Sequence, residues 1–362
     1  MSIFMRHPKD HVGIWFEQRR KLGINDTICW ARYTPESGTL NMHKFQHGNA
    51  DGMSVILYML KQAGHGDTEI PKCRELSPPS RKELKVIQKN MKAYPTKIKW
   101  QYWNPDIKQT ESTFNTLFFS KEETKFIEEK ATALNVPLTT LALWALNQSI
   151  SRHLLKPAQE YTWFYPVNLR GAVDYGTEYA NYASGFYLAV SSDISVQALH
   201  QRIRHKLRSR EHWLNWQQAK IAKYLPGFAL RCLYQYIAKK QFYAGSFSAM
   251  GTWSKEAVVS PEIPQQSHKK VRQDLSRERW FGCPPGTKNY PISNCVINWN
   301  GQLSLTLKLH PAIRGDAENS LITLCDWGQG LLGAHGTAQD EGGMRESVLT
   351  YHYDDAVTHD KA

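Results

Sequence analysis

Several features of secreted, membrane-spanning and zinc-stabilised proteins are missing from this sequence. Residues 1–20 mix charged and apolar side chains and contain no small-residue cleavage site, so we expect no secretory signal. The most apolar window, residues 137–155, is interrupted by polar side chains and fits a core helix rather than a transmembrane span. No two cysteines form a C-x-x-C pair, which argues against a zinc site or a disulfide framework. These absences predict a cytoplasmic protein without a transmembrane segment.

Two enzyme motifs are absent or misplaced. No G-x-S-x-G sequence occurs, so a serine hydrolase has no support. Gly328–Gly333 matches G-x-G-x-x-G, but a helix-poor tail follows it instead of the helix that a dinucleotide site requires. We therefore expect this segment to be the frayed end of the last helix. Histidines and aspartates after residue 351 have the chemistry of metal ligands, but we interpret them as a solvated tail and predict no metal.

What the sequence does contain is a surplus of positive charge on an ordinary globular composition. The chain has 362 residues, 41% of them hydrophobic, and 45 Lys and Arg against 33 Asp and Glu give a net charge of +12. This apolarity excludes disorder throughout, because burial can offset the ordering entropy. The length predicts two domains or lobes, or one large domain. The charge fits nucleic acid, an anionic membrane, a phosphorylated cofactor or an acidic partner protein.

Local patterns predict a mixed α/β (α+β) protein of two lobes. A strand over 38–46, a loop over 47–52 and a buried helix from residue 53 to 60 follow one another. A polar, proline-bearing connection with one helix comes next. The expected divisions are a reduced N-terminal lobe carrying the loop, a C-terminal lobe and a loosely held tail, at 1–110, 111–333 and 334–362.

The C-terminal lobe has the clearest local signals. Ser120 and Glu123 form a capping box, and Pro137 starts a second helix. Asn300-Gly301 between two alternating runs predicts a hairpin that is half-buried on its leucine face. The other expected elements are strands over 161–167 and 183–190, a long helical stretch over 194–225 and a final helix over 316–324.

The leading candidate site is the loop His47-Gly48-Asn49-Ala50-Asp51-Gly52. A histidine at the end of a strand can point into a cleft and act as a general base near neutral pH. Asp51 would turn back to bind a cation or backbone groups, and Gly52 would allow a tight turn into the helix. A surface loop with a chance histidine is the competing interpretation, since 14 histidines make such spacings common.

This loop resembles the hallmark His-His-x-x-x-Asp-Gly of the chloramphenicol-acetyltransferase-like superfamily of acyltransferases, which includes peptide-synthetase condensation domains and wax ester synthases. Here the first histidine is replaced by Gln46. Residues 165–170 and 181–184 resemble two motifs of the wax ester branch and come in the same order. Residues 246–253 occupy the place of that branch's crossover strand but do not preserve its motif. The sequence departs from this pattern in two ways. Only 46 residues precede His47, so the acceptor side of the substrate tunnel would be reduced or completed by another subunit. Residues 137–140 also lack the Asn-Asp pair of the wax ester branch.

The resemblance implies acyl transfer from a thioester. His47 would take the proton from a small-molecule hydroxyl or amine, and Asp51 would orient the loop through an ion pair with Arg170. Ser246 or Ser248 would donate to the oxyanion, although ordinary loop polarity is the favoured explanation for these serines. No cofactor would be bound permanently, and acyl-CoA or an acyl carrier protein would serve as donor substrate.

The basic stretch from Arg202 to Lys223 allows three interpretations: a solvated helix face, a surface for CoA phosphates or an acidic carrier protein, and a nucleic-acid surface. Trp213 and Trp216 lie in it, but no nucleic-acid-binding motif accompanies them, so we expect no nucleic acid. An amide-forming condensation enzyme on carrier-bound substrates and a non-catalytic basic binding module stay open as alternatives. The identity of the acyl donor, the identity of the acceptor and the oligomeric state also stay open.

Overall fold

Two β-sheets form the frame of the computed structural model, which describes residues 5–63, 70–107, 113–157, 159–253, 278–333 and 348–351. The larger sheet has the strand order β10-β3-β9-β8-β6-β4-β5, and the smaller one has the order β2-β1-β7. The strands are β1 (Thr27–Thr34), β2 (Thr39–Gln46), β3 (Phe114–Phe118), β4 (Glu160–Asn168), β5 (Ala183–Ser191), β6 (Gly245–Trp253), β7 (Arg279–Cys283), β8 (Ile292–Trp299), β9 (Gln302–Leu309) and β10 (Val348–Tyr351).

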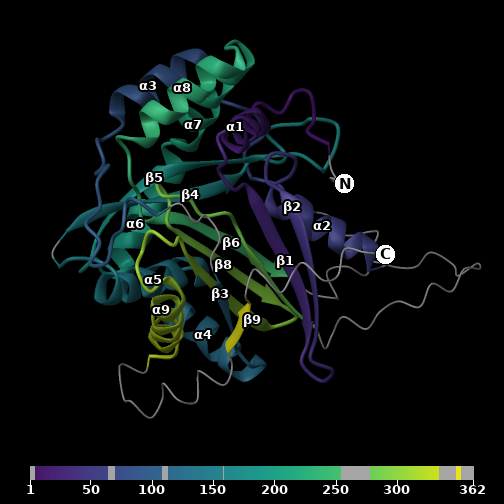
Figure 1. Ribbon diagram of the computed structural model, residues 1–362, viewed down its shortest axis with the longest axis vertical. Helices are drawn as coiled ribbons and strands as arrows, with labels where there is room; N and C mark the ends of the chain where they lie inside the picture. Colours follow the sequence, from purple (N-terminus) through teal and green to yellow (C-terminus); the bar gives the residue numbers. More distant parts are fainter. Residues whose placement is uncertain are drawn as a thin grey trace, which may run out of the picture.

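Figure 1 shows two groups of helices: one group lies against the large sheet, and the other is gathered at one end of the molecule. They are α1 (His11–Arg20), α2 (Gly52–Gln62), α3 (Arg81–Asn90), α4 (Lys121–Ala133), α5 (Leu138–His153), α6 (Val196–Arg208), α7 (His212–Ala219), the 3-10 helix η1 (Lys220–Lys223), α8 (Gly227–Ala238) and α9 (Asp316–Leu332). The predicted capping box is present at the start of α4, where the Ser120 and Glu123 side chains each bond the other's backbone N–H.

The main core lies between the large sheet and the helix pair α5 and α9. The two helices are packed against each other at Gly330, where an added Cβ would lie 3.4 Å from the Ala145 Cβ, in van der Waals contact. Trp327 Nε1 also donates to the Ala142 carbonyl, at 2.9 Å. The G-x-G-x-x-G segment is therefore an intact, buried helix end. The expected frayed end was wrong, and α9 runs eight residues beyond the expected helix.

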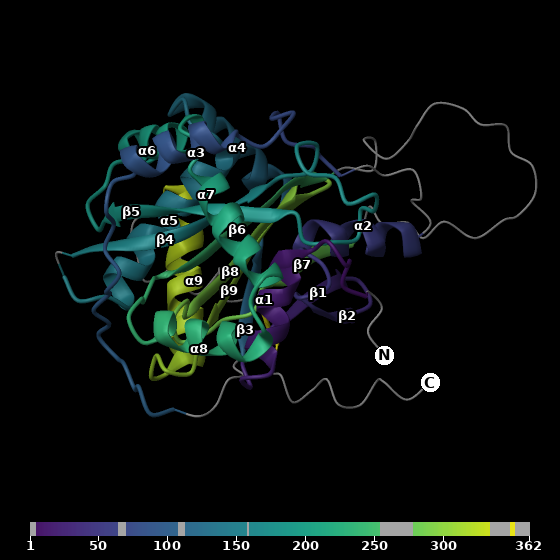
Figure 2. The same ribbon diagram turned by 90° about the horizontal axis from the view of Figure 1, so that it is seen from above.

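The small sheet packs on the opposite side of the large one, so that β1 and β2 lie across the sheet from α5 and α9 (Figure 1, Figure 2). The stacked rings of Trp280 and Trp299, with centroids 4.4 Å apart, join β7 to β8. The β8–β9 hairpin turns at Asn300-Gly301, both with positive φ, as predicted. It is buried on both faces rather than on its leucine face alone, because helices and the small sheet cover it from either side.

The expected long helix over 194–225 is broken. Arg210 has a left-handed backbone, φ 59°, which ends α6 and lets the chain turn into α7. This turn buries the rings of Trp213 and Trp216, which are therefore not available to stack on bases. Lys206 pairs with Glu211 and Arg210 with Glu75, so the basic stretch is not one continuous solvated surface.

Some paired strands come from different segments of the expected domain division. β7 comes from the C-terminal segment but pairs with β1, and β10, from the segment expected to be a loose tail, pairs with β3. Helix α1 and strand β1 had no counterpart among the predicted elements. Within the described ranges, no helix combines the length and apolar composition that crossing a bilayer requires. The histidines and aspartates after residue 351 lie outside the described residues.

Candidate active site

The His47 loop lies between two regular elements. Strand β2 ends at Gln46, and Asp51 is the N-cap of α2, so the loop leads from the strand end into a buried helix, as predicted. The His47 backbone N–H donates to the Asp26 carbonyl at 2.8 Å, which holds the start of the loop against the segment before β1. The histidine is thus anchored through its backbone, independently of its ring.

The His47 ring is oriented by two contacts. Its Nδ1 lies 3.1 Å from the Ala50 carbonyl oxygen, and because a carbonyl only accepts, Nδ1 carries the proton and donates. In the neutral ring this leaves the lone pair on Nε2. The Phe16 ring stacks on the imidazole, with centroids 4.1 Å apart. Burial lowers the pKa of His47 below 6.5 in spite of the nearby Asp51 charge, so the ring is neutral at pH 7.

Helix α1 carries Phe16 and packs directly on the loop backbone. A Cβ at Gly13 would lie 2.3 Å from the Gly48 carbonyl oxygen, so only glycine fits this crossing. Asp10 caps the helix by accepting from the Gly13 N–H and also accepts from the Asn181 N–H, at 2.8 and 3.2 Å. These contacts hold α1 over the half-buried His47 residue.

Asp51 is held by four hydrogen bonds and has no spare capacity for proton transfer. Its two oxygens accept from the backbone N–H groups of Ser54 and Tyr182, each at 2.9 Å, and from both terminal nitrogens of Arg170. Burial opposes ionisation, but the guanidinium and the hydrogen bonds outweigh it, so the pKa of Asp51 lies below 3.8. Asp51 is a fixed carboxylate that orients the loop.

Arg170, which follows β4, makes the bidentate pair with Asp51 at 2.8 and 2.9 Å. Both side chains are buried, with 7% and 5% of their surface exposed. The guanidinium also donates to Ser54 Oγ at 2.6 Å and lies over the Tyr182 ring, 4.4 Å from its centroid. The structure thus brings together two of the predicted site residues that are far apart in the sequence.

The segment between β4 and β5 donates two hydrogen bonds to the His47 loop. Asn181 Nδ2 donates to the His47 carbonyl at 2.6 Å, while the Tyr182 N–H donates to Asp51. The loop is therefore bound at its first and fifth residues by two consecutive residues of one segment. This is the stretch, 181–184, that the sequence matched to the wax ester branch.

Gly52 has a different role from the predicted one. Its φ is not positive, so the turn does not need the freedom of glycine. Instead, a Cβ at Gly52 would lie 3.2 Å from Met250 Sδ, on β6. The glycine leaves room for the Met250 side chain where the start of α2 passes close to the strand.

Ser246 and Ser248 lie on β6, ahead of Met250. Along this strand Phe247 and Ala249 pack into the core that contains α5. Because side chains alternate across a sheet, the two serines point to the opposite face, on which Met250 meets Gly52. The site contacts described above join His47, Asp51, Gly52 and Arg170, whereas neither serine makes a side-chain contact with that group among the described residues.

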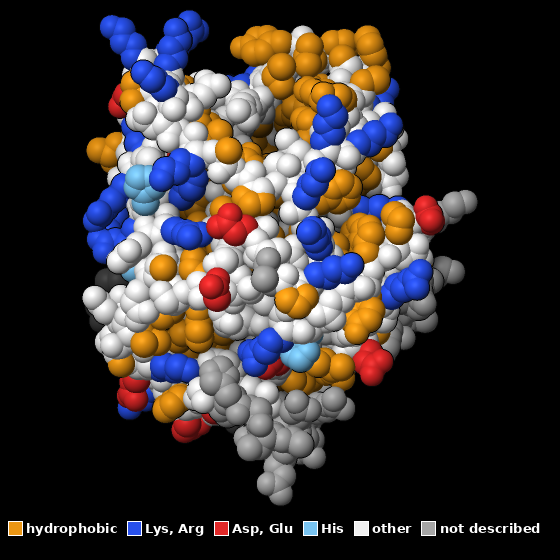
Figure 3. Space-filling model, turned by 90° about the vertical axis from the view of Figure 1, so that its left-hand side faces the viewer, with side chains coloured by type: hydrophobic (Ala, Val, Ile, Leu, Met, Phe, Trp, Pro, Cys, Tyr) orange, Lys and Arg blue, Asp and Glu red, His pale blue; other side chains and the backbone are white. Residues whose placement is uncertain are grey.

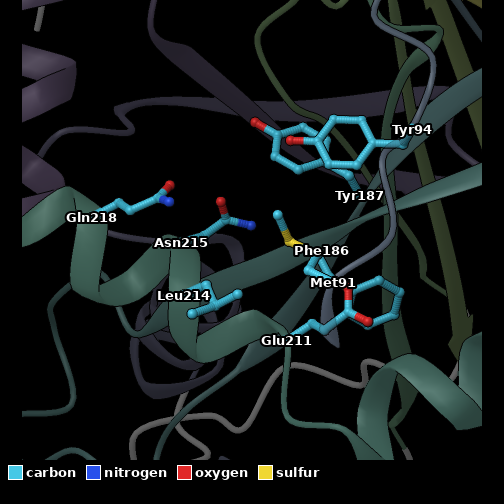
Figure 4. A pocket seen from close by; sticks show the side chains of 8 residues that line it. All are labelled: Met91, Tyr94, Phe186, Tyr187, Glu211, Leu214, Asn215 and Gln218. Atoms are coloured by element: carbon cyan, nitrogen blue, oxygen red, sulfur yellow. The ribbon is translucent and has the colours of Figure 1, made fainter. Parts of the chain in front are cut away.

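A small cavity lies elsewhere, between β5, α7 and the end of α3. Figure 4 shows tyrosine, amide and carboxylate groups around it. Its volume of about 30 Å³ holds a water molecule rather than a thioester. No predicted site residue lines this cavity; the lining side chains are Met91, Tyr94, Phe186, Tyr187, Glu211, Leu214, Asn215 and Gln218.

Sequence reasoning missed the residues that α1 contributes. Asp10 precedes an unrecognised helix, and its position as an N-cap was the one signal that could have pointed to it. Phe16 and Gly13 gave no signal, because their roles depend on how α1 crosses the loop. Asn181 was noted only as part of a matching segment, without its contact to His47.

No protein-family model and no curated protein matches the sequence. Among solved structures, the nonribosomal peptide synthetase FmoA3 aligns with a TM-score of 0.50 and 13% identity, covering 83% of this chain and 32% of that one. The EpoB cyclization-docking bidomain from Sorangium cellulosum gives 0.49 and 10%, covering 81% and 60%. The epimerization domain of the third module of tyrocidine synthetase B gives 0.48 and 11%, covering 82% and 69%.

This chain spans less than two thirds of the first two of these structures, and at such identities the likeness concerns the fold. The predicted fold class is confirmed: the chain has mixed β-sheets with flanking helices, in a two-lobed α/β fold like that of the aligned part of FmoA3.

Proposed function

We propose that this protein is an acyltransferase in which His47 is the general base. It moves an acyl group from a thioester, acyl-CoA or an acyl carrier protein, to a hydroxyl or amine acceptor. The observation that carries the proposal is the hydrogen bond from His47 Nδ1 to the Ala50 carbonyl, because it fixes the tautomer whose Nε2 accepts a proton.

The lowered pKa of His47 suits this role. A base must be unprotonated before it acts, and burial keeps the ring neutral at pH 7. The stacked Phe16 ring restricts the imidazole to one plane, and the backbone contacts of the loop fix its position. A preoriented base lowers the entropic cost of reaching the transition state.

The proposed reaction uses His47 as the base throughout. Nε2 takes the proton from the acceptor as its oxygen or nitrogen forms a bond to the thioester carbonyl carbon. The carbonyl oxygen becomes an oxyanion, for which Ser246 or Ser248 on β6 is the proposed donor. When the carbon–sulfur bond breaks, the thiolate receives the proton from the imidazolium, and the base returns to its neutral form.

Asp51 and Arg170 support the base without exchanging protons. Their buried ion pair fastens the loop to the segment that follows β4, so His47 keeps its orientation as the substrate enters. Both are positioning residues. Their loss is expected to lower turnover through a misplaced imidazole.

The test measures free thiol released from a panel of acyl-CoAs, with and without amine and alcohol acceptors. We expect His47→Ala to reduce acceptor-dependent release by at least about a hundredfold, the usual contribution of a general base, with an unchanged melting temperature. His205→Ala is the matched control, because His205 is an exposed histidine on α6. It should retain full activity.

Two outcomes would contradict the proposal. Undiminished turnover by His47→Ala would remove the histidine from the mechanism. Absence of thiol release with every CoA and carrier-protein thioester, together with salt-dependent binding of nucleic acid, would favour a non-catalytic basic module.

A further inference from the structure

Exposed apolar side chains are concentrated at one end of the molecule. Among the described residues, twelve large hydrophobic side chains are exposed. Five of these twelve lie in one segment, residues 221–237, which covers most of η1 and α8. These are Ile221, Tyr224, Phe228, Tyr236 and Ile237, exposed to 41, 81, 65, 58 and 37%. Isolated exposed hydrophobics need no explanation, but such a concentration marks an interaction surface. We call this group the α8 stripe.

Helix α8 has a distinct inner face that fixes its orientation. Leu230 is buried, Arg231 donates to Gln18 Oε1 at 2.8 Å, and Arg19 of α1 lies over the Tyr234 ring. The outer face carries Phe228, Cys232 and Tyr236 at four-residue spacing, which places them on one side of the helix. The stripe is therefore held outward by packing on the opposite side.

The α8 stripe is bordered by lysines and contains no carboxylate. Residues 220–240 include Lys220, Lys223, Lys239 and Lys240 but no Asp or Glu. Lys240 Nζ lies 4.1 Å from the centroid of the Tyr236 ring, alongside the stripe. Helix α3, at the same end of the molecule, adds four exposed basic residues: Arg81, Lys82, Lys85 and Lys89. Figure 3 shows hydrophobic side chains gathered at this end, beside Lys and Arg side chains.

The charges decide between the possible occupants. A second copy would bring its own lysines against these, and like charges repel. Protein interfaces favour arginine and exclude lysine from their cores, whereas lysines around this stripe suit a membrane, in which their stems lie along the apolar layer and their ammonium groups reach the headgroups. A helix with aromatic and aliphatic side chains on one face and lysines beside them is typical of helices that lie in a membrane interface.

We propose that the α8 stripe docks the protein onto an anionic lipid surface. The apolar side chains would enter the boundary between headgroups and acyl chains, and the lysines of η1 and α3, with Lys239 and Lys240 directly after α8, would contact the lipid phosphates. This surface would account for part of the +12 net charge. The proposal goes beyond the acyl transfer proposed above and uses none of its residues.

Cys232 provides a direct probe, because it is the exposed thiol of the six cysteines and lies on the outer face of α8. A Cys73→Ser protein, labelled at Cys232 with an environment-sensitive fluorophore, is mixed with phosphatidylcholine vesicles with and without phosphatidylserine. We expect a blue shift and co-sedimentation with the anionic vesicles only, both reversed by high salt.

Three variants of the unlabelled protein locate the effect by co-sedimentation. Phe228→Ser with Tyr236→Ser should weaken vesicle binding by at least about tenfold through lost apolar burial. Lys239→Gln with Lys240→Gln should weaken it about fivefold for each charge removed. Phe126→Ser is the matched control, because Phe126 is a 50% exposed aromatic residue beside Lys125 on α4, and it should bind as wild type does.

Several results would overturn the proposal, provided that thermal melting shows every variant to be folded. They are no binding to anionic vesicles, undiminished binding of the Phe228→Ser/Tyr236→Ser variant, and equal weakening by Phe126→Ser. A dimer in light scattering that this double variant dissociates, without vesicle binding, would assign the stripe to a second copy. His47→Ala should bind vesicles normally, so failure of docking and failure of acyl transfer are separate results.

Discussion

The buried pair between Asp51 and Arg170 offers the sharpest test of how the loop is held. We consider three variants: Asp51→Asn, Arg170→Met and the double variant. In Arg170→Met the carboxylate keeps only the two backbone N–H groups of Ser54 and Tyr182, while 95% of its surface stays buried. In Asp51→Asn the guanidinium loses its counter-charge and stays 7% exposed.

The magnitude follows from this burial. Removing one partner of a buried, hydrogen-bonded pair typically costs about 3 to 5 kcal/mol, because the other charge is left uncompensated. The double variant leaves no buried charge behind, so its cost should fall short of the sum of the single costs by about 2 to 3 kcal/mol. Arg170→Lys should be nearly as damaging as Arg170→Met, because an ammonium cannot make the bidentate contact.

The assay is urea unfolding followed by circular dichroism, with the three variants forming a double-mutant cycle. Strictly additive costs would refute the reasoning, since they would mean that the two side chains do not stabilise one another. Small single costs, within the range of exposed ion pairs at about 1 kcal/mol or less, would refute it as well.

The same pair predicts a pH dependence of stability. The pKa of Asp51 is lower in the folded protein than its ordinary value of 3.8, so the folded state favours the ionised form. The stabilisation is therefore fully present above pH 3.8 and is lost as the pH falls through the lower folded pKa. Asp51→Asn should show a shallower loss of stability than wild type below that pH.

Two further predictions concern the loop and its neighbours. Thiol release should rise with pH as His47 loses its proton, with a midpoint below pH 6.5, because burial lowers the pKa of His47; a midpoint above 6.5 in the pH–rate profile would contradict this. Gly52→Ala should destabilise the protein by about 1 kcal/mol, because the new Cβ lies 3.2 Å from Met250 Sδ. In calorimetry, the Gly52→Ala/Met250→Ala double variant should recover part of the melting temperature that the Gly52→Ala single variant loses. No recovery would mean that Gly52 is needed for another reason.

Local chemistry made part of the structure predictable. The capping box at Ser120 and the turn at Asn300-Gly301 depend on residues that are within three positions of one another, so their physics is contained in the sequence. The His47 loop was located for the same reason, since a strand, a short loop and a buried helix follow directly. These elements needed no knowledge of distant parts of the chain.

The errors came from contacts between distant segments. The hairpin was expected to be half-buried because leucines alternate in β9, yet helices on one side and β7 on the other cover both faces. The long helix over 194–225 was expected from its composition, yet Arg210 adopts a left-handed backbone that redirects the chain. Neither covering elements nor a single unusual φ leaves a periodic signal.

The candidate site depends on the same kind of long-range contact, and this explains why a short motif is not sufficient to make a base. The His47 ring is stacked on Phe16 of α1, its carbonyl is held by Asn181, and the loop is anchored through Asp51 to Arg170. These contacts come from α1 and from the segment between β4 and β5, both of which are distant from the loop in the sequence. A chance His-x-x-x-Asp-Gly loop would lack them, so its ring would be solvated and free to rotate, with a pKa near 6.5. What would distinguish a general base from a surface histidine here is therefore the convergence of α1 and the β4–β5 segment on the loop, and the variants at Asp51 and Arg170 perturb that convergence without replacing His47 itself.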